Sequence, residues 1–162
     1  MGIDGIGARV LRKEDKRFIT GKGRYTDDMS VPGMKHAHFV RSPHAHAEIK
    51  KIDTKKALAM PGVIAVLTGK ELKADGIGNI ICGWMIHSKD GSPMKMGAWS
   101  PLATDTVRYV GDAIVIVVAD TKSQARDAAE AVDITYKVKK AVVSAVDALK
   151  AGAPQIHPEA AG

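Results

Sequence analysis

The stretch that decides the fold is VRYVGDAIVIVVADTKSQARDAAEAVDITY, residues 107–136. Within it, residues 113–119 (AIVIVVA) form an unbroken apolar run of strand length, rich in β-branched side chains. A continuous run, unlike an alternating one, is typical of a strand that is covered on both faces. We therefore predict that residues 113–119 are the central strand of the sheet. Residues 107–110 should form a short strand, joined to the central one by a hairpin turn at Gly111 and Asp112.

A helix is predicted directly after this strand. Thr121 and Gln124 have the spacing of a capping box, which satisfies backbone donors at a helix start. Four apolar side chains then fall on one helix face: Ala125, Ala128, Ala129 and Val132. Residues 133–136 (DITY) return to strand character, and the order strand, helix, strand implies a right-handed crossover if both strands share one sheet in parallel. This unit is a scaffold without an obvious catalytic group.

The same signals predict the other elements. Strands are expected at residues 36–41 (HAHFVR), 45–52 (AHAEIKKI, with a bulge) and 63–67 (VIAVL), and helical turns at residues 55–60, 69–73 and 146–150. We expect residues 1–30 to be an extended arm with turns at Gly21 and Gly23, residues 31–150 to be the folded domain, and residues 151–162 (AGAPQIHPEAAG) to be a C-terminal linker.

Composition narrows the class of protein. The chain has 162 residues, 45% of them hydrophobic, which suits one compact domain. No apolar run approaches the roughly 20 residues of a membrane span, and no secretory signal is visible at the N-terminus. The one cysteine, Cys82, is interpreted as an inert small hydrophobe, and it excludes an internal disulfide. We therefore expect a cytoplasmic protein with no membrane partner.

The net charge of +6 raises nucleic acid as a partner. The lysines are spread along the chain, however, and aromatic residues make up only 4% of it. That is too few for a platform on which bases could stack. We therefore predict no nucleic-acid partner, and interpret the charge as a solvated lysine surface.

A long inserted loop, residues 75–105, interrupts the folded domain. It carries large apolar side chains without helical or strand periodicity: Trp84, Met85, Met94, Met96 and Trp99. An irregular stretch of this length inside a compact domain is often functional, and exposed Trp and Met are typical of an interaction surface. The alternative is a small local core that folds onto the sheet. Both interpretations stay open at this point.

Four histidines invite a metal hypothesis. His36 and His38 share one face of a predicted strand, as do His44 and His46, and pairing of the two strands would give a zinc or iron geometry. No carboxylate is obviously near to complete the site, so structural histidines with satisfied hydrogen bonds are the favoured interpretation. No signature of a hydrolase, metalloprotease or kinase is present either. We predict no metal-binding, catalytic or cofactor-binding residue. If a metal does bind, these four histidines are its candidate ligands.

Several separate motifs stand in the order found in a known family. They are RKED at residues 12–15, TGKGRYTDD at 20–28, VRSPHAHAEI at 40–49, MPGV at 60–63 and VRYVGD at 107–112. Together they resemble the N-terminal α/β-hammerhead domain of the molybdenum hydroxylase large subunits of xanthine dehydrogenase, aldehyde oxidase and aerobic carbon-monoxide dehydrogenase. The resemblance implies an α+β fold with a mixed β-sheet and two main helices packed on it. The chain departs from the family after Tyr136, where Lys137, Lys139 and Lys140 stand in place of an acidic residue and a Leu-Pro pair.

The resemblance also implies a function. In this family the molybdopterin or molybdopterin cytosine dinucleotide cofactor and the glutamate base lie in later domains, and iron–sulfur clusters and FAD complete the enzyme. Such an enzyme oxidises a small carbon substrate (an aldehyde, an N-heterocycle or CO) with water. This chain alone would be an inactive structural domain that contacts the molybdopterin-binding domains and the iron–sulfur and flavin subunits. Its start without an iron–sulfur region favours the arrangement with separate subunits.

The residues that we expect at these interfaces are Arg41, His44, His46, Trp84, Met85, Met94, Met96 and Trp99. The alternative function is an independent binding module, with a histidine-rich metal site or a basic nucleic-acid-binding surface. Elemental analysis separates the two, because a stoichiometric metal lost on changing His38 and His46 to Ala would favour the binding module.

Overall fold

The structure is a computed structural model that describes residues 6–7 and 12–160, in two compact units, Met1–Met34 and Lys35–Gly162. In the first unit, the predicted extended arm contains a short helix, α1 (Asp15–Ile19), and a 3-10 turn, η1 (Thr26–Asp28). Next to the helix, the Phe18 ring stacks on the Tyr25 ring with 5.4 Å between centroids, and it lies where a Cβ of Gly23 would stand. Gly21 makes the predicted turn, with a φ of +69°.

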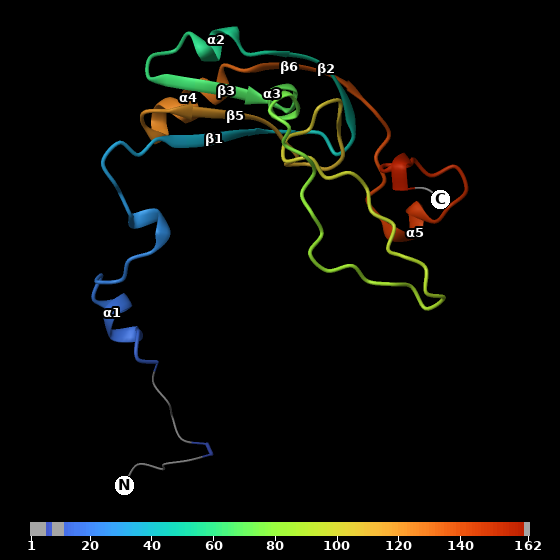
Figure 1. Ribbon diagram of the computed structural model, residues 1–162, viewed down its shortest axis with the longest axis horizontal. Coiled ribbons are helices and arrows are strands. Elements are labelled where there is room, and N and C mark those ends of the chain that lie inside the picture. Colours follow the sequence, from blue (N-terminus) through green and yellow to red (C-terminus); the bar gives the residue numbers. More distant parts are fainter. Residues whose placement is uncertain (1–5, 8–11, 161–162) are drawn as a thin grey trace. The chain divides into compact units, whose positions relative to one another are not determined.

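The second unit is built on a three-stranded antiparallel sheet with the order β1-β5-β3 (Figure 1). Its strands are β1 (His36–Arg41), β3 (Val63–Thr68) and β5 (Ala113–Ala119). The prediction of a central strand at residues 113–119 is therefore confirmed. Val115, Val117 and Ala119 are fully buried on one face. On the other face Ile114 is also fully buried, but Ile116 and Val118 are only half-buried. The second face is less completely covered than the apolar run predicts.

A second antiparallel sheet has the order β4-β2-β6, with β2 (Ala47–Asp53), β4 (Thr106–Val107) and β6 (Asp133–Val138). The fold class is thus α+β as predicted, but two antiparallel sheets replace the single mixed sheet. Strands β5 and β6 lie in different sheets, so the condition for the parallel crossover, one shared sheet, is not met. The physical reason lies in β6, whose alternating half-buried and exposed side chains suit an antiparallel sheet with one wet face. The predicted bulge in β2 is confirmed by a register shift between Ile49 and Lys51.

The predicted hairpin at residues 107–119 is wrong. Val107 pairs with Ala47 of β2 rather than with β5. The turn at Gly111 is present, with a φ of +92°, but it carries the chain from one sheet to the other. It is held by backbone hydrogen bonds to Ser42: the Ser42 amide donates to Asp112, and the Gly111 amide donates to the Ser42 carbonyl, both at 2.8 Å. These bonds to a distant segment occupy the groups that a hairpin would have used.

The helices of this unit lie close to the positions that the local sequence signals predict. They are α2 (Lys55–Leu58), α3 (Gly69–Ala74), α4 (Lys122–Glu130) and α5 (Ala145–Ala148), with a 3-10 turn η2 (Pro158–Ala160). The Thr121 hydroxyl accepts the amide hydrogen of Gln124 at the start of α4. Helix α4 packs its alanine face against β1 and β5, where Ala128 and Ala129 join the same buried cluster as Val117. Within residues 6–7 and 12–160, no helix is long and apolar enough to cross a membrane.

Candidate functional site

The long loop, residues 75–105, leaves the sheets after α3 and returns just before β4, and Figure 1 draws it from green to yellow, away from the strands. Its two halves run beside each other. The Ile80 amide donates to the Trp99 carbonyl at 2.8 Å, and the Met94 amide donates to the Ile86 carbonyl at 3.1 Å. The loop is therefore a ribbon with its own backbone hydrogen bonds rather than an open coil.

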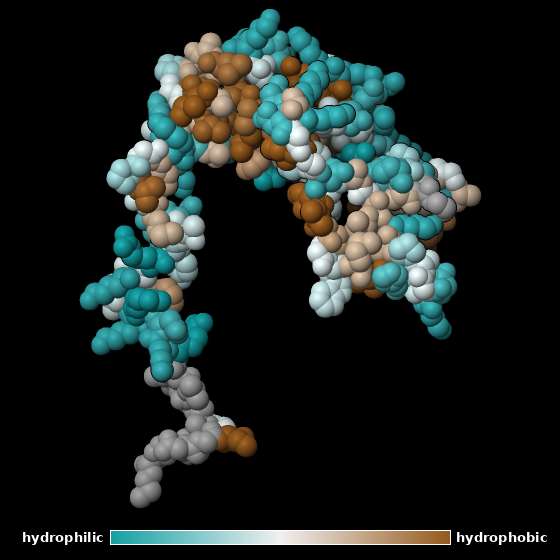
Figure 2. Space-filling model, in the orientation of Figure 1, coloured by the Kyte–Doolittle hydropathy of each residue, from teal (hydrophilic) through white to brown (hydrophobic). Residues whose placement is uncertain are grey.

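The apolar side chains of this ribbon are directed to solvent. Trp84 is 80% exposed and Trp99 is 60% exposed. The others with high exposure are Ile77, Ile80, Ile81, Met85, Ile86 and Met96, while Met94 is half-buried. This exposure does not fit a small core folded onto the sheet. Figure 2 shows brown, hydrophobic atoms at the surface where the loop descends from the sheets. Exposed apolar side chains gathered in this way are typical of a surface that a partner covers.

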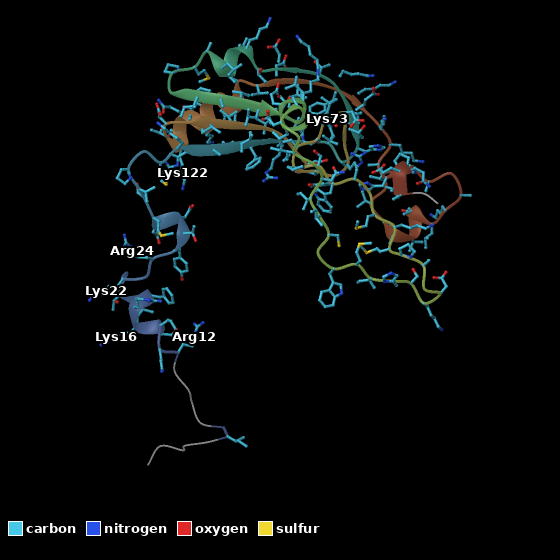
Figure 3. All side chains as sticks on the ribbon, viewed as in Figure 1. Arg12, Lys16, Lys22, Arg24, Lys73 and Lys122 are labelled. Atoms are coloured by element: carbon cyan, nitrogen blue, oxygen red, sulfur yellow. The ribbon has the colours of Figure 1, made fainter. Side chains whose placement is uncertain are left out.

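The loop begins and ends at a cleft of about 420 Å³. The Trp99 ring lies on one side of it, 6.3 Å from the ring of Tyr109 between their centroids, and Lys73 from α3 lines another part. Figure 3 labels Lys73 at the top of the loop. Burial, and then the charge of Asp112, raise the pKa of Tyr109 above 10.0. The cleft is thus lined by two aromatic rings and has charged side chains at its edge.

The C-terminal segment meets the base of the loop through one carboxylate. Glu159 accepts a hydrogen bond from the Ala98 amide at 3.1 Å, and its carboxylate lies 3.0 Å from Nδ1 of His157. Arg108 lies 3.8 Å from the same carboxylate and donates to the Ile156 carbonyl at 3.2 Å. The bond with His157, followed by backbone donors, lowers the pKa of Glu159 to about 2. The sequence did not lead us to predict this network. The one pattern that could have indicated it is a histidine two residues before a glutamate in the predicted linker.

Arg41 and Trp99, both predicted interface residues, contact the same turn at residues 108–112. The Arg41 guanidinium donates to the Gly111 carbonyl at 2.9 Å and stands 5.4 Å over the Phe39 ring. Trp99 approaches that turn through Tyr109. The structure therefore brings these two residues to one part of the surface, which their separation in sequence did not reveal.

His44 and His46 lie in the turn before β2 and make internal contacts. The His44 ring meets the Tyr136 ring edge-on, with 4.9 Å between centroids. His46 is 8% exposed, and its Nδ1 lies 2.9 Å from the Lys140 carbonyl oxygen. Since a carbonyl can only accept, Nδ1 carries the proton. His46 has the contacts of a structural histidine.

The histidine hairpin considered from the sequence does not form. His36 and His38 lie on β1, which pairs with β5, whereas His44 and His46 precede β2, which pairs with β4 and β6. The four rings therefore belong to different sheets, because each strand has a long-range partner in place of its neighbour. Among the residues that the structure describes, no three His, Cys, Asp or Glu side chains form a group that could hold a metal ion. The half-buried Cys82 thiol donates to the Trp84 carbonyl at 3.2 Å.

Known proteins are similar to this chain in sequence and in fold. Residues 20–140 match the family described as "Aldehyde oxidase and xanthine dehydrogenase, a/b hammerhead domain". The carbon monoxide dehydrogenase large chain of Hydrogenophaga pseudoflava is 41% identical over 163 residues, which cover 100% of this chain and 19% of the relative. A crystal structure of Cu,Mo-CO dehydrogenase in its carbon monoxide reduced state superposes with a TM-score of 0.74 at 38% identity, covering 94% of this chain and 18% of that chain. Quinoline 2-oxidoreductase from Pseudomonas putida 86 gives a TM-score of 0.76 at 35% identity, covering 87% and 17%. The chain thus spans less than a fifth of the length of these relatives.

Proposed function

Because this chain belongs to the aldehyde oxidase and xanthine dehydrogenase family of a/b hammerhead domains, we propose that it is the non-catalytic hammerhead domain of a molybdenum-hydroxylase large subunit. It resembles the N-terminal domain of such subunits. In this role it contacts the molybdopterin-binding domains of the subunit, and the iron–sulfur and flavin subunits lie beside it in the assembled enzyme. The observation that carries the proposal is the exposed apolar ribbon of residues 75–105.

The ribbon has the features of a docking element. Its two tryptophans are rigid and large, and residues of this kind dominate the binding energy of most protein interfaces. Trp84 at 80% exposure and Ile81 at 89% have little cover in this chain. Burial of one such tryptophan removes about 150–250 Å² from water. At about 25 cal/mol per Å² this is worth roughly 4–6 kcal/mol before the costs of association. Burial of the ribbon against a partner surface is therefore a favourable contribution to the free energy of association.

The buried polar groups in the described part of the chain do not point to a site for the cofactor of such an enzyme. Within residues 6–7 and 12–160, every buried side-chain nitrogen or oxygen already has a hydrogen-bond partner, so no buried polar side chain is left for a ligand to satisfy. The guanidinium of Arg108 at the cleft donates hydrogen bonds to the carbonyls of Thr106 and Ile156 and forms an ion pair with Glu159. We therefore assign molybdopterin, the iron–sulfur clusters and FAD to other parts of the complete enzyme and route no chemical step through this domain.

The complete enzyme, in this proposal, oxidises a small carbon substrate with water. The names of the relatives point to carbon monoxide and to an N-heterocycle, quinoline, as examples of that class. We place the enzyme in the cytoplasm, which the single cysteine supports. The hammerhead domain contributes architecture, so it sets how the catalytic domains and electron-transfer subunits are held rather than which bond is broken.

The experiment is a chimera. The matching segment of the Hydrogenophaga pseudoflava large chain is replaced by this chain, and assembly with the other subunits is measured by size-exclusion chromatography. Ile86→Lys places a charge on the ribbon, and Ile64→Lys is the matched control on β3, because the two isoleucines are 60% and 52% exposed. We expect Ile86→Lys to reduce assembly at least about tenfold, in line with a lost apolar anchor, and Ile64→Lys to leave it unchanged.

Two results contradict the proposal. If Ile86→Lys and Ile64→Lys assemble equally well, the ribbon is not the docking element. If the isolated chain turns over carbon monoxide, an aldehyde or quinoline above a control without protein, the domain is not a non-catalytic one. A melting curve of each variant chain excludes loss of folding as the cause of lost assembly.

A further inference from the structure

The outer face of the β4-β2-β6 sheet carries lysines that the proposed function leaves unused. The inner face of this sheet packs on the core through Ile49, Ile134 and Tyr136. On β6, side chains alternate, so the exposed Lys137 points away from the core. In register, Lys137 stands opposite Glu48 of β2. Figure 2 shows hydrophilic atoms along the edge of the molecule where Figure 1 places β2 and β6.

We define the lysine face as Lys50 and Lys137 on the sheet and Lys139 and Lys140 directly after β6, together with Glu48. Four lysines against one carboxylate leave a net charge of +3. Among the described residues, Lys50 is the one lysine of this set that forms an ion pair, with Glu48. In the described part of the chain, the ammonium groups of the other three lysines form no ion pair. The hydrogen bond from Lys50, together with the charges of Lys50, Lys139 and Lys137, lowers the pKa of Glu48 below 4.5 even though partial burial opposes it.

The positive excess is confined to this end of the sheet. At the other end, Lys51 pairs with Asp53 at 3.0 Å, and Asp133 stands opposite Asp53. The lysine face is therefore a local patch and not an evenly charged surface.

The backbone under the patch is held in place by His46. The Lys139 amide donates to the His46 carbonyl at 2.9 Å, and the His46 ring donates from Nδ1 to the Lys140 carbonyl at 2.9 Å. The ring is buried, at 8% exposure, so these bonds are shielded from water. The lysines are thus presented from a fixed strand end, which reduces the entropy lost when a partner binds.

We propose that the lysine face binds an acidic protein surface. Free ammonium groups in a local patch attract carboxylates and set association rate and register. Glu48 in the centre of the patch would repel the phosphates of a nucleic acid or a lipid surface, whereas a protein partner can place a lysine or arginine against it. The one aromatic residue of β6, Tyr136, is turned to the core, so no ring is offered for base stacking. This proposal does not depend on the enzyme assignment above.

The test uses the whole chain and poly-L-glutamate as the probe, with duplex DNA and phosphatidylserine vesicles as competing probes. The variant is K137E/K139E/K140E, and the matched control is K13E/K16E/K22E on the N-terminal arm, which changes the net charge equally. Figure 3 shows Lys16 and Lys22 on that arm. We expect poly-L-glutamate to bind, to be released by salt, and to bind the sheet variant at least about tenfold more weakly than the arm control, since each close charge pair contributes modestly.

Equal weakening by both variants would show only net-charge attraction and would overturn the proposal. Tighter binding of DNA or of the vesicles than of poly-L-glutamate would overturn it as well. Because charge reversal could disturb folding, K137Q/K139Q/K140Q is measured in parallel. It removes the charges without adding new ones, and binding at the parent affinity by this folded variant would also refute the proposal.

Discussion

Substitution of Val117 tests the central feature of the fold. Val117 lies in the middle of β5, is 0% exposed, and stands between His38 of β1 and Val66 of β3. Its neighbour Val118, which is half-buried, points to the opposite face of the same strand. The two valines therefore offer the same residue type, in the same strand, with different burial.

The expected losses in the free energy of unfolding follow from that difference in burial. Val117→Ala removes two methyl-sized groups, each worth about 0.8 kcal/mol on burial. The cavity left in a packed core adds to this, so we expect a loss of about 2–3 kcal/mol in the free energy of unfolding. Val117→Asp buries a carboxylate without an ionic partner and should cost several kcal/mol, on the order of the roughly 5–15 kcal/mol that holds a whole domain. Val118→Ala should cost about 1 kcal/mol, because its side chain is already partly in water.

The assay is urea unfolding followed by far-ultraviolet circular dichroism, which reports the free energy of unfolding for each variant. We expect the order Val117→Asp, Val117→Ala, Val118→Ala, with the Asp variant showing no cooperative transition. The assignment of Val117 to the buried face is refuted if Val117→Asp unfolds at the parent midpoint, or if Val118→Ala costs more than Val117→Ala. Either result would mean that the buried face of β5 has been assigned to the wrong side chains.

Tryptophan fluorescence of the dilute monomer should be red-shifted and open to quenchers, because both tryptophans lie in the exposed ribbon; protected blue emission would show that the ribbon is a core instead. The bond with His157 lowers the pKa of Glu159 from 4.5 to about 2, so the link to the Ala98 amide should be complete above pH 4.5 and be lost as the pH falls toward 2. Hydrogen exchange at Ala98 should show this acid step, and Glu159→Gln should abolish it; an unchanged step would point to another group. His46→Ala leaves the backbone carbonyl that its ring binds without a partner and should cost about 1–3 kcal/mol in a melting experiment. The exposed His38→Ala should stay within about 0.5 kcal/mol, and equal effects would contradict the structural role of His46.

Local features were readable from the sequence because they depend on neighbouring residues alone. The apolar run of β5 needs no partner to be recognised, since its length and β-branched composition are properties of seven consecutive residues. The capping box at Thr68 and the helix cap at Thr121 are likewise closed within three residues, by Glu71 and Gln124. The family resemblance rests on the same kind of information, motifs in order along the chain.

The candidate site was predictable only in part. The composition of residues 75–105 indicated an irregular segment but left open whether its tryptophans are exposed or form a small local core, and the structure shows both tryptophans in solvent. The cleft at its base was not predictable, because Arg108, Glu159 and Ala98 are up to 61 residues apart in sequence and meet only after folding. The role of His46 depended on a carbonyl 94 residues away.

What the sequence by itself determined is where most of the strands and helices of residues 31–150 form and that the chain is a hammerhead domain. What only the tertiary structure decided is which strands share a sheet. Adjacent strands β1 and β2 were expected to pair, yet β1 joins β5 and β2 joins β6. A backbone hydrogen bond is equally good with any strand partner, so local sequence does not select one. The selection comes from apolar faces that must share one core, with Val117 and Ala128 on one side and Ile49 and Ile134 packed against the same cluster. That is a sum of contacts between distant residues, and it exists only once the chain has folded.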